Sequence, residues 1–407
     1  MSEVGTGAGV SEVPPPIREI EVAEEPPAPG EVGRVGVLGA GTMGAGIAQL
    51  CARAGVETLL CDANPDALAA GLARIESSLA RAVERGRSTE AEAAATRARV
   101  RPAASIEELA GVELAIEVVP EIVDLKARLL ADLAALPGEP ILASNTSSIS
   151  IATLAERSGA PERVLGLHFF NPPTAMPLIE LVATPRTDRG ALGRARMLGE
   201  RLGKQVVDVT DGPGFLVNRC ARPFYMESLR MVEDGFAEPW EIDRACVELG
   251  GFPLGPFELM DTVGVDISLA VTKSMWEQSY GEPRWRPSPI QVAQVAAGRL
   301  GRKTGGGFYD DGDSWRSRPG ASPDLATTIL DRVVANLVNE AAFALAAGIA
   351  TPADLERAMV IGLNHPKGPE AWEREWGRER IVEILDHLWD TEHDPRYRVA
   401  PRLRRPA

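Results

Sequence analysis

The sequence predicts an α/β fold in which a doubly wound, mainly parallel β-sheet is followed by a duplicated all-helical region. Short apolar segments typical of strands alternate with helix-like segments from Val35 to about Asp211. This alternation indicates a parallel sheet with helices on both faces. From Phe215 onward the segments are helix-like only, and Gly212-Pro213-Gly214 marks the change.

Each predicted strand is a short apolar run bounded by polar or glycine-containing turns. The predicted strands are 34–38, 57–61, 114–119, 141–143, 164–170, 178–182 and 205–209. The predicted helices between them are 45–54, two helices within 64–99, 125–136, 151–157 and 189–202.

The helical region contains an internal repeat, because Pro253 recurs as Pro366 and Arg219 as Arg332, in both cases 113 positions later. The same offset relates Gly255 to Gly368, Pro256 to Pro369, Glu227 to Glu340, Gly235 to Gly348 and Ala245 to Ala358. Matches of this number without a gap indicate a duplicated helical module.

The composition excludes several classes of protein. The net charge of −15 argues against nucleic acid as a partner, so an anionic substrate would need a local basic patch. No apolar run approaches the length of a membrane span and no signal pattern opens the chain, so we expect a cytoplasmic protein without a membrane partner. No metal site is predicted, because Cys51, Cys61, Cys220 and Cys246 have neither metal nor redox spacing.

The run Gly39-Ala40-Gly41-Thr42-Met43-Gly44 predicts a dinucleotide site because of its context. A strand precedes it, a helix follows it, and the acidic Asp62 ends the next strand. The first glycine permits a tight turn, the second lets the backbone approach a pyrophosphate, and the third lets helix and strand pack closely. The N–H groups at the start of the helix then hold the phosphates. An ordinary glycine-rich turn is the disfavoured alternative.

These patterns divide the 407 residues into domains, since a chain of this length is too long for one compact core. Residues 1–32 are expected to be a disordered Pro/Glu-rich extension, and 33–211 a Rossmann-type dinucleotide-binding domain. Residues 212–310 are expected to be a first helical module for substrate binding and dimer-type packing. A linker, 311–323, would then lead to a second, degenerate module, 324–400.

His168 is the candidate general base. It ends an apolar strand beside the Asn171-Pro172 turn, at the edge of the sheet where ligands bind in doubly wound folds. Glu180 begins the next apolar run after a turn, so the returning chain can bring its carboxylate into contact with His168. A histidine held in this way accepts a proton near neutral pH, as oxidation of an alcohol requires. A structural histidine and a solvated strand-end carboxylate remain the alternatives.

Two further residues are candidate hydrogen-bond donors to a carbonyl oxygen that forms in the reaction. Ser147 lies in the polar cluster 144–148 after a strand, and Asn218 follows the glycine-containing boundary. A helix cap for Ser147 and a domain-boundary contact for Asn218 are the alternatives.

A local basic patch is predicted on the helix after Asp62. Arg74, Ser78, Arg81 and Arg85 fall on one helical face, which would suit an anionic substrate in an acidic chain. A merely solvated face is the alternative.

Together these residues resemble the 3-hydroxyacyl-CoA dehydrogenases of fatty acid β-oxidation, including bacterial 3-hydroxybutyryl-CoA and 3-hydroxyadipyl-CoA forms. The resemblance covers residues 33–309, and the second helical copy extends it as in two-module bacterial members. The motifs are Gly-Ala-Gly-Thr-Met-Gly (39–44), Ser-Asn-Thr-Ser-Ser (144–148), Gly-Leu-His-Phe-Phe-Asn-Pro (166–172), Pro-Gly-Phe-Leu-Val-Asn-Arg (213–219) and Gly-Pro-Phe-Glu-Leu-Met-Asp (255–261).

The resemblance implies reversible oxidation of an L-3-hydroxyacyl-CoA, short-chain or dicarboxylic, to the 3-ketoacyl-CoA with NAD. His168 matches the family's catalytic base and Glu180 the partner that orients it. Ser147 matches a serine near the substrate hydroxyl and the nicotinamide, and Asn218 an asparagine that holds the substrate oxygen.

The resemblance also implies contacts to the cofactor and to CoA. Asp62 matches the acid that binds the adenosine ribose, and its charge favours NAD over NADP. The other implied cofactor contacts are Gly39, Gly41, Thr42, Met43, Gly44, Glu121, Lys126, Ser147, Asn171 and Lys303. The implied CoA contacts are Ser78, Ser147 and Arg85, where arginine replaces the family's lysine with the same charge and a different geometry.

The residues leave two other functions open: dehydrogenation of a free 3-hydroxy acid such as gulonate, and dinucleotide binding without turnover. The basic helix face favours CoA, and the set of Ser147, His168, Glu180 and Asn218 favours an enzyme. In the second helical copy Asp331 stands where the first has Asn218. We therefore expect the second copy to be structural and the chain to be pseudo-dimeric, with a further homodimer left open.

Overall fold

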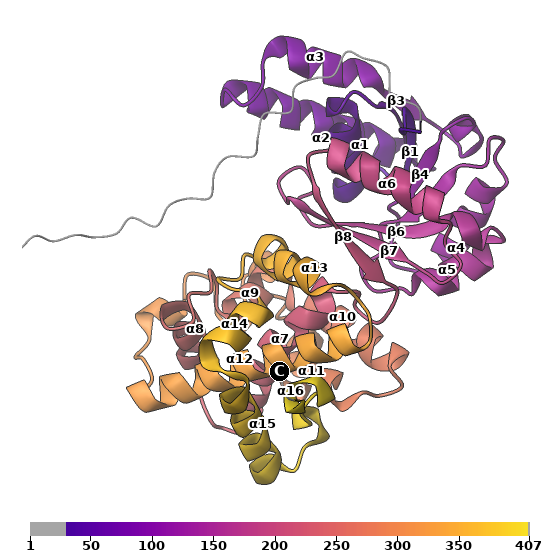
Figure 1. Ribbon diagram of the computed structural model, residues 1–407. Helices are drawn as coiled ribbons and strands as arrows, with labels where there is room; N and C mark the ends of the chain where they lie inside the picture. The colour runs from indigo at the N-terminus through magenta and orange to yellow at the C-terminus, as the bar shows by residue number, and fades with distance from the viewer. Residues whose placement is uncertain (1–29, 406–407) are drawn as a thin grey trace, which may run out of the picture.

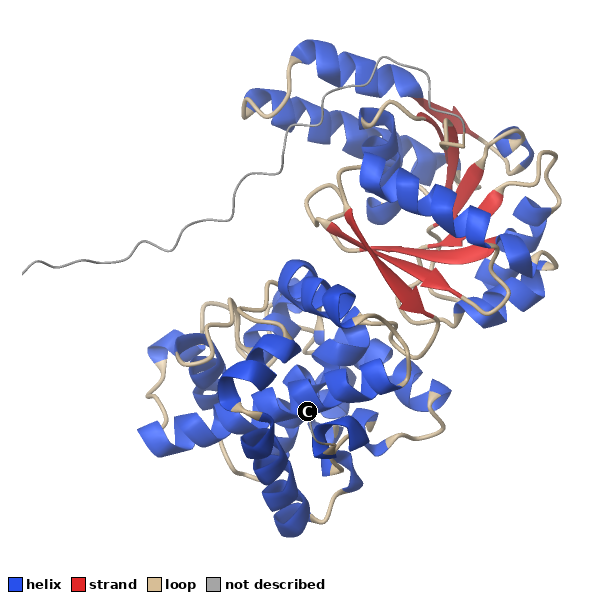
Figure 2. Ribbon diagram, viewed as in Figure 1, coloured by secondary structure: helices blue, strands red, loops and turns tan. Residues whose placement is uncertain are grey.

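The computed structural model describes residues 30–405 and contains an eight-stranded sheet, drawn in red in Figure 2. In chain order the strands are β1 (Arg34–Leu38), β2 (Glu57–Cys61), β3 (Val100–Ala103), β4 (Leu114–Glu117), β5 (Ile141–Ser144), β6 (Val164–Phe169), β7 (Leu178–Ala183) and β8 (Gln205–Thr210). Their spatial order is β3-β2-β1-β4-β5-β6-β7-β8, and only the β6–β7 pair is antiparallel. The predicted mainly parallel, doubly wound sheet is confirmed.

Strand β3 is the one strand of this sheet that the sequence pattern does not predict. It lies at the edge of the sheet beside β2, and its residues Val100-Arg101-Pro102-Ala103 form no apolar run. An edge strand can carry a proline and exposed side chains because one of its sides pairs with no neighbour.

Helices cover both faces of the sheet (Figure 1). They are α1 (Thr42–Arg53), α2 (Pro65–Glu84), α3 (Glu90–Arg99), α4 (Val123–Ala134), α5 (Ile151–Ser158) and α6 (Arg189–Arg201). Apolar side chains of α1, α2, α3 and α6 pack on one face, and those of α4 and α5 on the other. The two helices expected within 64–99 are therefore present as α2 and α3.

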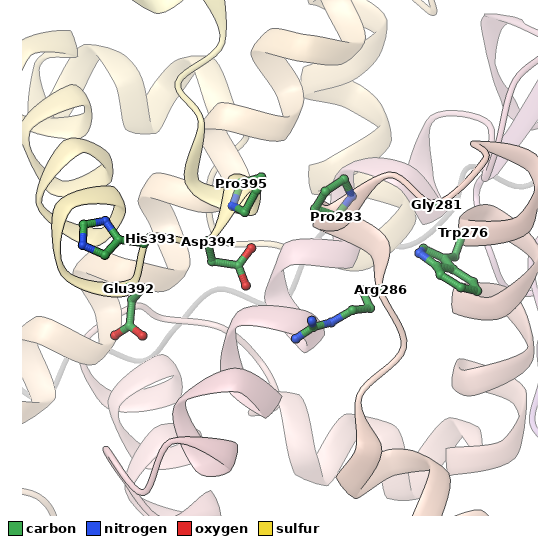
Figure 3. Close-up of a pocket in the computed structure, with 8 residues that line it drawn as sticks. All are labelled: Trp276, Gly281, Pro283, Arg286, Glu392, His393, Asp394 and Pro395. Carbon is green, nitrogen blue, oxygen red and sulfur yellow. The ribbon is translucent and has the colours of Figure 1, made fainter.

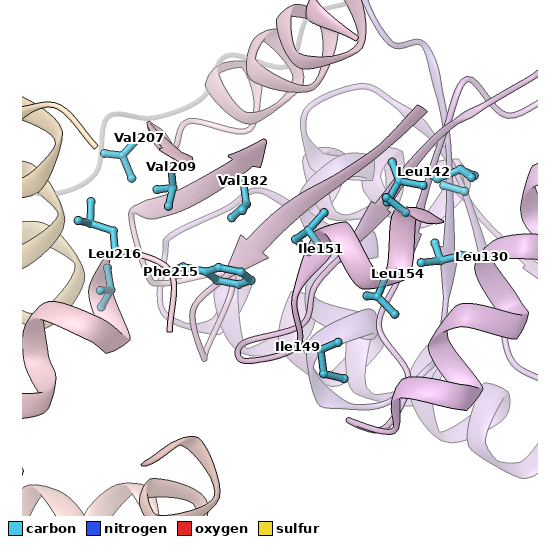
Figure 4. Close-up of a cluster of buried hydrophobic side chains, with 14 of the residues drawn as sticks. Leu130, Leu142, Ile149, Ile151, Leu154, Val182, Val207, Val209, Phe215 and Leu216 are labelled. Atoms are coloured by element: carbon cyan, nitrogen blue, oxygen red, sulfur yellow. The ribbon is translucent and has the colours of Figure 1, made fainter. Parts of the chain in front are cut away.

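The core beneath α4 and α5 continues into the helical region. It includes Leu142 and Ile151 of the α/β domain together with Phe215, Leu216 and Met359. Figure 4 shows the labelled part of this cluster running from Leu130 to Val207 and Leu216. The two parts of the chain therefore share one continuous buried core.

The predicted N-terminal extension ends earlier than expected, although residues 1–29 lie outside the described part. Val32 is buried, and Glu31 forms an ion pair with Arg201 at 3.4 Å. Gly30–Val32 therefore pack against the α/β domain.

The region after Asp211 is helical and is built twice, as expected from the repeat. The first copy contains α7 (Val217–Glu233), α8 (Pro239–Glu248), α9 (Pro256–Val263), α10 (Val265–Gln278) and α11 (Pro289–Ala296). The second contains α12 (Pro323–Ala346), α13 (Pro352–Arg357), α14 (Pro369–Trp376), α15 (Arg378–Glu392) and α16 (Pro401–Arg404). The second copy thus extends past residue 400, and no helix of the described residues is long and apolar enough to cross a membrane.

The two helical copies pack against each other through α7 and α12, which Figure 1 labels near the centre of the helical region. Two reciprocal ion pairs join these helices. Arg219 of the first copy pairs with Glu340 of the second at 2.8 Å, and Arg332 of the second pairs with Glu227 of the first at 2.6 Å. The two arginines are equivalent positions of the repeat, and so are the two glutamates. Such an exchange is the signature of an isologous, two-fold interface, here formed within one chain.

Candidate active site

The glycine run forms the turn between β1 and α1 as the sequence predicts. Gly39 has a φ of +111°, and a Cβ there would lie 2.8 Å from the Val118 carbonyl oxygen. A Cβ on Gly44 would lie 1.8 Å from the Gly39 carbonyl oxygen. A Cβ on Gly41, by contrast, would meet nothing within 4 Å, so the open side of the turn is at this glycine.

The open side of this turn fits a dinucleotide. Gly41 is the N-cap of α1 and supplies no side-chain cap, so the first N–H groups of the helix face outward with Thr42 and Met43 in the first turn. Asp62 lies beside the turn, where its Oδ2 accepts a hydrogen bond from the Ala40 N–H at 2.9 Å. A carboxylate has about four acceptor positions, so Asp62 keeps capacity for a ribose hydroxyl.

Glu121 and Lys126 connect the loops that follow β4 and β5. The Lys126 ammonium donates to Glu117 at 2.7 Å and to the Val119 carbonyl at 3.0 Å, and it lies 3.3 Å from Glu121. Glu121 in turn accepts from the Ser147 N–H at 3.1 Å. Burial opposes ionisation of Glu121, but Lys126 and these hydrogen bonds hold its pKa below the ordinary value. Lys126 itself is buried, so its ammonium supports the loop from beneath.

His168 and Glu180 are direct cross-strand neighbours, because β7 returns antiparallel to β6. The His168 Nδ1 lies 2.6 Å from Glu180 Oε2, and both side chains are buried. The other carboxylate oxygen of Glu180 accepts from the N–H groups of Leu216 at 3.0 Å and Val217 at 2.8 Å. The start of α7 therefore fixes the carboxylate that holds the imidazole.

Ser147 and Asn218 meet beside this pair. Asn218 lies in the first turn of α7, and its Nδ2 donates to the Ser147 carbonyl oxygen at 3.2 Å. Asn145, which precedes Ser147 in the same loop, accepts from the Phe169 N–H at 2.8 Å and so ties this loop to the end of β6. Three separate segments are thereby gathered at the carboxyl edge of the sheet.

The loop that carries Asn171 is held by a buried lysine, Lys204, that no sequence pattern predicts. The Lys204 ammonium donates to the carbonyl oxygens of Pro173 and Met176, each at 2.7 Å. Burial lowers the pKa of Lys204 to about 8. A single lysine before an apolar run carries no local signal of such a role.

The predicted basic face lies on α2 and begins at the glycine turn. Arg74 donates to the Ala40 carbonyl oxygen at 3.4 Å, and Arg81 further along is exposed. Ser78 is half-buried on this face, and Arg85 is the C-cap residue of the helix. These four residues therefore follow one another along α2, starting with Arg74 at the dinucleotide turn.

Lys303 lies elsewhere, in the helical region between the two copies. Its ammonium pairs with Asp266 at 2.6 Å, in the first turn of α10. In this structure its partner is therefore a carboxylate of the first module.

A separate hollow of about 340 Å³ lies between the two helical copies (Figure 3). Its lining residues are Trp276, Gly281, Pro283 and Arg286 from the first copy and Glu392, His393, Asp394 and Pro395 from the second. None of the residues around His168 lines it. Within residues 30–405, no cluster of three or more His, Cys, Asp or Glu is arranged to hold a metal ion.

Two family models match this chain over most of its length. The model for the NAD binding domain of 3-hydroxyacyl-CoA dehydrogenase matches residues 34–212. The model for the C-terminal domain of 3-hydroxyacyl-CoA dehydrogenase matches twice, at 214–311 and 329–406, once for each helical copy.

Individual relatives agree with these matches. The 3-hydroxyadipyl-CoA dehydrogenase of Escherichia coli (strain K12) is 34% identical over 92% of this chain and 97% of its own length. The 3-hydroxybutyryl-CoA dehydrogenase of Mycobacterium tuberculosis (strain H37Rv) is 42% identical over 68% of this chain and 97% of its own. A crystal structure of 3-hydroxybutyryl-CoA dehydrogenase from Escherichia coli K12 superposes with a TM-score of 0.85 at 33% identity, covering 92% of this chain and 98% of its own.

Proposed function

This chain belongs to the 3-hydroxyacyl-CoA dehydrogenase family, and from that premise we propose that His168 and Glu180 are its general-base pair. The chain is an NAD-binding oxidoreductase of fatty acid-related metabolism. The proposed reaction is reversible oxidation of an L-3-hydroxyacyl-CoA to the 3-ketoacyl-CoA. The observation that carries it is the 2.6 Å contact between His168 Nδ1 and Glu180, at the same carboxyl edge of the sheet as the dinucleotide turn.

Glu180 determines which ring nitrogen of His168 accepts the proton. An Nδ1–H that donates to the carboxylate leaves Nε2 as the acceptor for the substrate hydroxyl proton. The resulting imidazolium is stabilised by the adjacent negative charge. Because Leu216 and Val217 donate to Glu180, the carboxylate is already oriented before the proton moves.

Ser147 and Asn218 hold the substrate oxygen next to this base. A serine hydroxyl and an amide N–H are both donors, which suits an oxygen that becomes a carbonyl. NAD, when bound, accepts the hydride that leaves C3. Asp62 favours NAD over NADP, because its carboxylate would repel a 2′-phosphate.

The basic face of α2 supports CoA rather than a free acid as the carrier of the substrate. Arg81 and Arg85 are exposed and lie on the helix that begins beside the dinucleotide turn. The 3′-phosphate and pyrophosphate of CoA are anions of the kind that such arginines bind. The relatives named for 3-hydroxyadipyl-CoA and 3-hydroxybutyryl-CoA support short-chain or dicarboxylic acyl groups.

The proposal is tested with His168→Gln in an assay of NADH consumption on acetoacetyl-CoA. Loss of a general base predicts a fall in kcat of about 100- to 10,000-fold, with NADH affinity retained in a fluorescence titration. The exposed His393→Gln is the control and keeps wild-type turnover. Near-normal turnover of His168→Gln would refute the assigned base, and turnover of free acetoacetate in preference to the thioester would refute the CoA substrate.

A further inference from the structure

Arg222 is a buried arginine whose hydrogen-bond acceptors are all neutral. It lies in α7 with 3% of its surface exposed. Its guanidinium donates to the carbonyl oxygens of Asn218 and Ser268, each at 3.4 Å, and to the Thr272 hydroxyl at 3.2 Å. These contacts are long for hydrogen bonds of a charged donor. Burial lowers the pKa of Arg222 to about 10, and within residues 30–405 no carboxylate oxygen lies within 4.0 Å of it.

The other buried arginines of the helical region are paired with carboxylates. Arg219 contacts Glu340 at 2.8 Å, Arg332 contacts Glu227 at 2.6 Å, and Arg396 contacts Asp394 at 3.1 Å. A buried cation without an anion is costly in free energy. Within residues 212–405, Arg222 is therefore the buried arginine without a carboxylate partner.

The duplicated module shows that the helical fold does not require this arginine. At the offset of 113 positions, Ala335 takes the place of Arg222 on α12 and is fully buried. The neighbouring Arg219 is retained as Arg332, so the scaffold residue is kept in both copies. Asn218, which becomes Asp331, differs at the same offset. Positions 218 and 222 lie one helical turn apart.

Arg222 lies within reach of a group attached to the reacting carbon. Its Nη2 donates to Asn218 Oδ1 at 3.4 Å, and Asn218 is the residue proposed to hold the C3 oxygen. One turn of helix separates the two residues by about 6 Å. In a six-carbon acyl chain, three carbon–carbon bonds of about 1.5 Å each separate C3 from a terminal C6 carboxylate. Three such bonds reach at most about 4.5 Å. The side chains of Arg222 and Asn218 contact each other at 3.4 Å, so one acyl chain of this length can contact Asn218 at its C3 oxygen and Arg222 at its C6 carboxylate.

We propose that Arg222 binds the terminal carboxylate of an ω-carboxylated, six-carbon 3-hydroxyacyl-CoA. This inference rests on the proposed function and names the substrate class of the same site. The planar guanidinium binds a carboxylate with two parallel hydrogen bonds, and the hydroxyls of Ser268 and Thr272 lie beside it. A neutral acyl chain of equal length would leave the buried charge without an anion, so the site favours the dicarboxylic thioester.

The test compares 3-ketoadipyl-CoA with 3-ketohexanoyl-CoA, which have the same carbon count and differ in the terminal carboxylate. For the wild-type chain, kcat/KM is expected to be at least about 10-fold higher for the dicarboxylic substrate. In Arg222→Met the ratio of the two kcat/KM values should fall about 10- to 100-fold, chiefly through KM for 3-ketoadipyl-CoA. Arg222→Lys should have a ratio between those of the wild type and Arg222→Met. Lysine keeps the positive charge but lacks the paired N–H donors with which a guanidinium binds both oxygens of a carboxylate.

The matched control is Arg374→Met, which removes the same charge from an exposed position and should leave the ratio unchanged. Equal losses on both substrates in Arg222→Met would overturn the inference and leave Arg222 as a positioning residue for Asn218. A wild-type chain that reduces both substrates equally well would also overturn it. A wild-type chain that reduces neither substrate would instead refute the proposed function.

Discussion

The two helical copies have kept the charged residues that join them, whereas two residues of the first copy at the proposed site have no equivalent in the second. Arg219 and Glu227 of the first copy have identical equivalents in Arg332 and Glu340. Asp243 caps the start of α9 through the Phe257 N–H at 2.9 Å, and its equivalent Glu356 accepts from the N–H of Glu370 at the start of α14.

Two positions of the first copy at the proposed site, Asn218 and Arg222, are not kept in the second copy. Asn218 is replaced by Asp331, which pairs with Arg380 at 2.7 Å on the exposed side of α12. Arg222 is replaced by Ala335. Because both copies fold alike, the module can form without an asparagine or an arginine at these two positions. The kept ion-pair residues and these two replaced residues therefore contrast a scaffold role with a proposed site role within a single chain.

The reciprocal ion pairs should give the largest effects on stability. Glu227→Gln and Glu340→Gln each leave a buried arginine without its carboxylate, which costs about 3–5 kcal/mol. Urea unfolding followed by circular dichroism measures the loss in each variant. The exposed pair of Lys367 and Glu375 supplies the control, and Glu375→Gln should cost less than about 1 kcal/mol. Losses as small as the control's in both variants would contradict a shared scaffold role.

The kinetic difference between the copies should be nearly as large. Asn218→Ala removes the proposed donor to the reacting oxygen, which predicts a fall in kcat of about 100- to 1,000-fold, or about 3–4 kcal/mol. Asp331→Ala, at the equivalent position of the second copy, should leave kcat on acetoacetyl-CoA unchanged. A large rate change in Asp331→Ala would show that the second copy also takes part in the reaction.

A smaller effect is expected from a histidine that only the second copy carries. His365 replaces Phe252 of the first copy, and the two rings lie 5.0 Å apart in a buried contact. Burial lowers the pKa of His365 to about 4, below its ordinary value of 6.5. The neutral ring is thus favoured in the folded state, so stability is retained above pH 6.5 and lost as the pH falls toward 4.

His365→Phe, which restores the residue of the first copy, should remove this loss. The free energy of unfolding of His365→Phe should exceed that of the wild-type chain by about 3 kcal/mol at pH 4 and by close to zero at pH 8. A packing difference between the two side chains would add the same amount at both pH values. Unfolding free energies measured at both pH values test it, with the exposed His393→Phe as control. If the unfolding free energies of the wild type and His365→Phe changed equally between the two pH values, a destabilising protonation of His365 would be contradicted.

Much of this fold follows from local sequence pattern. Apolar runs predict the central strands, because buried parallel strands need apolar residues on both faces. Strand β3 escapes the pattern because it is an edge strand with exposed side chains. Helix α1 begins at Thr42, inside the glycine run, because Gly41 is already its N-cap.

The site could be anticipated only in part. The contact of His168 with Glu180 follows from two strand positions joined by a short return. The supporting residues depend on partners far along the chain that no local pattern reveals. Lys204 reaches carbonyl groups of a loop 28 and 31 positions earlier, and Asn145 reaches Phe169 across 24 positions.

The hydrogen bonds from the Leu216 and Val217 N–H groups to Glu180 make the proposed general base a composite of two domains. The α/β domain holds the whole glycine turn and both members of the proposed His168–Glu180 pair. It lacks, on its own, the two N–H groups that orient the carboxylate. On the proposed function, cofactor affinity and proton transfer are therefore separable properties of this chain. We expect residues 30–211 to suffice for the first and docking of α7 to be needed for the second, so that turnover would report the integrity of the junction between the two domains.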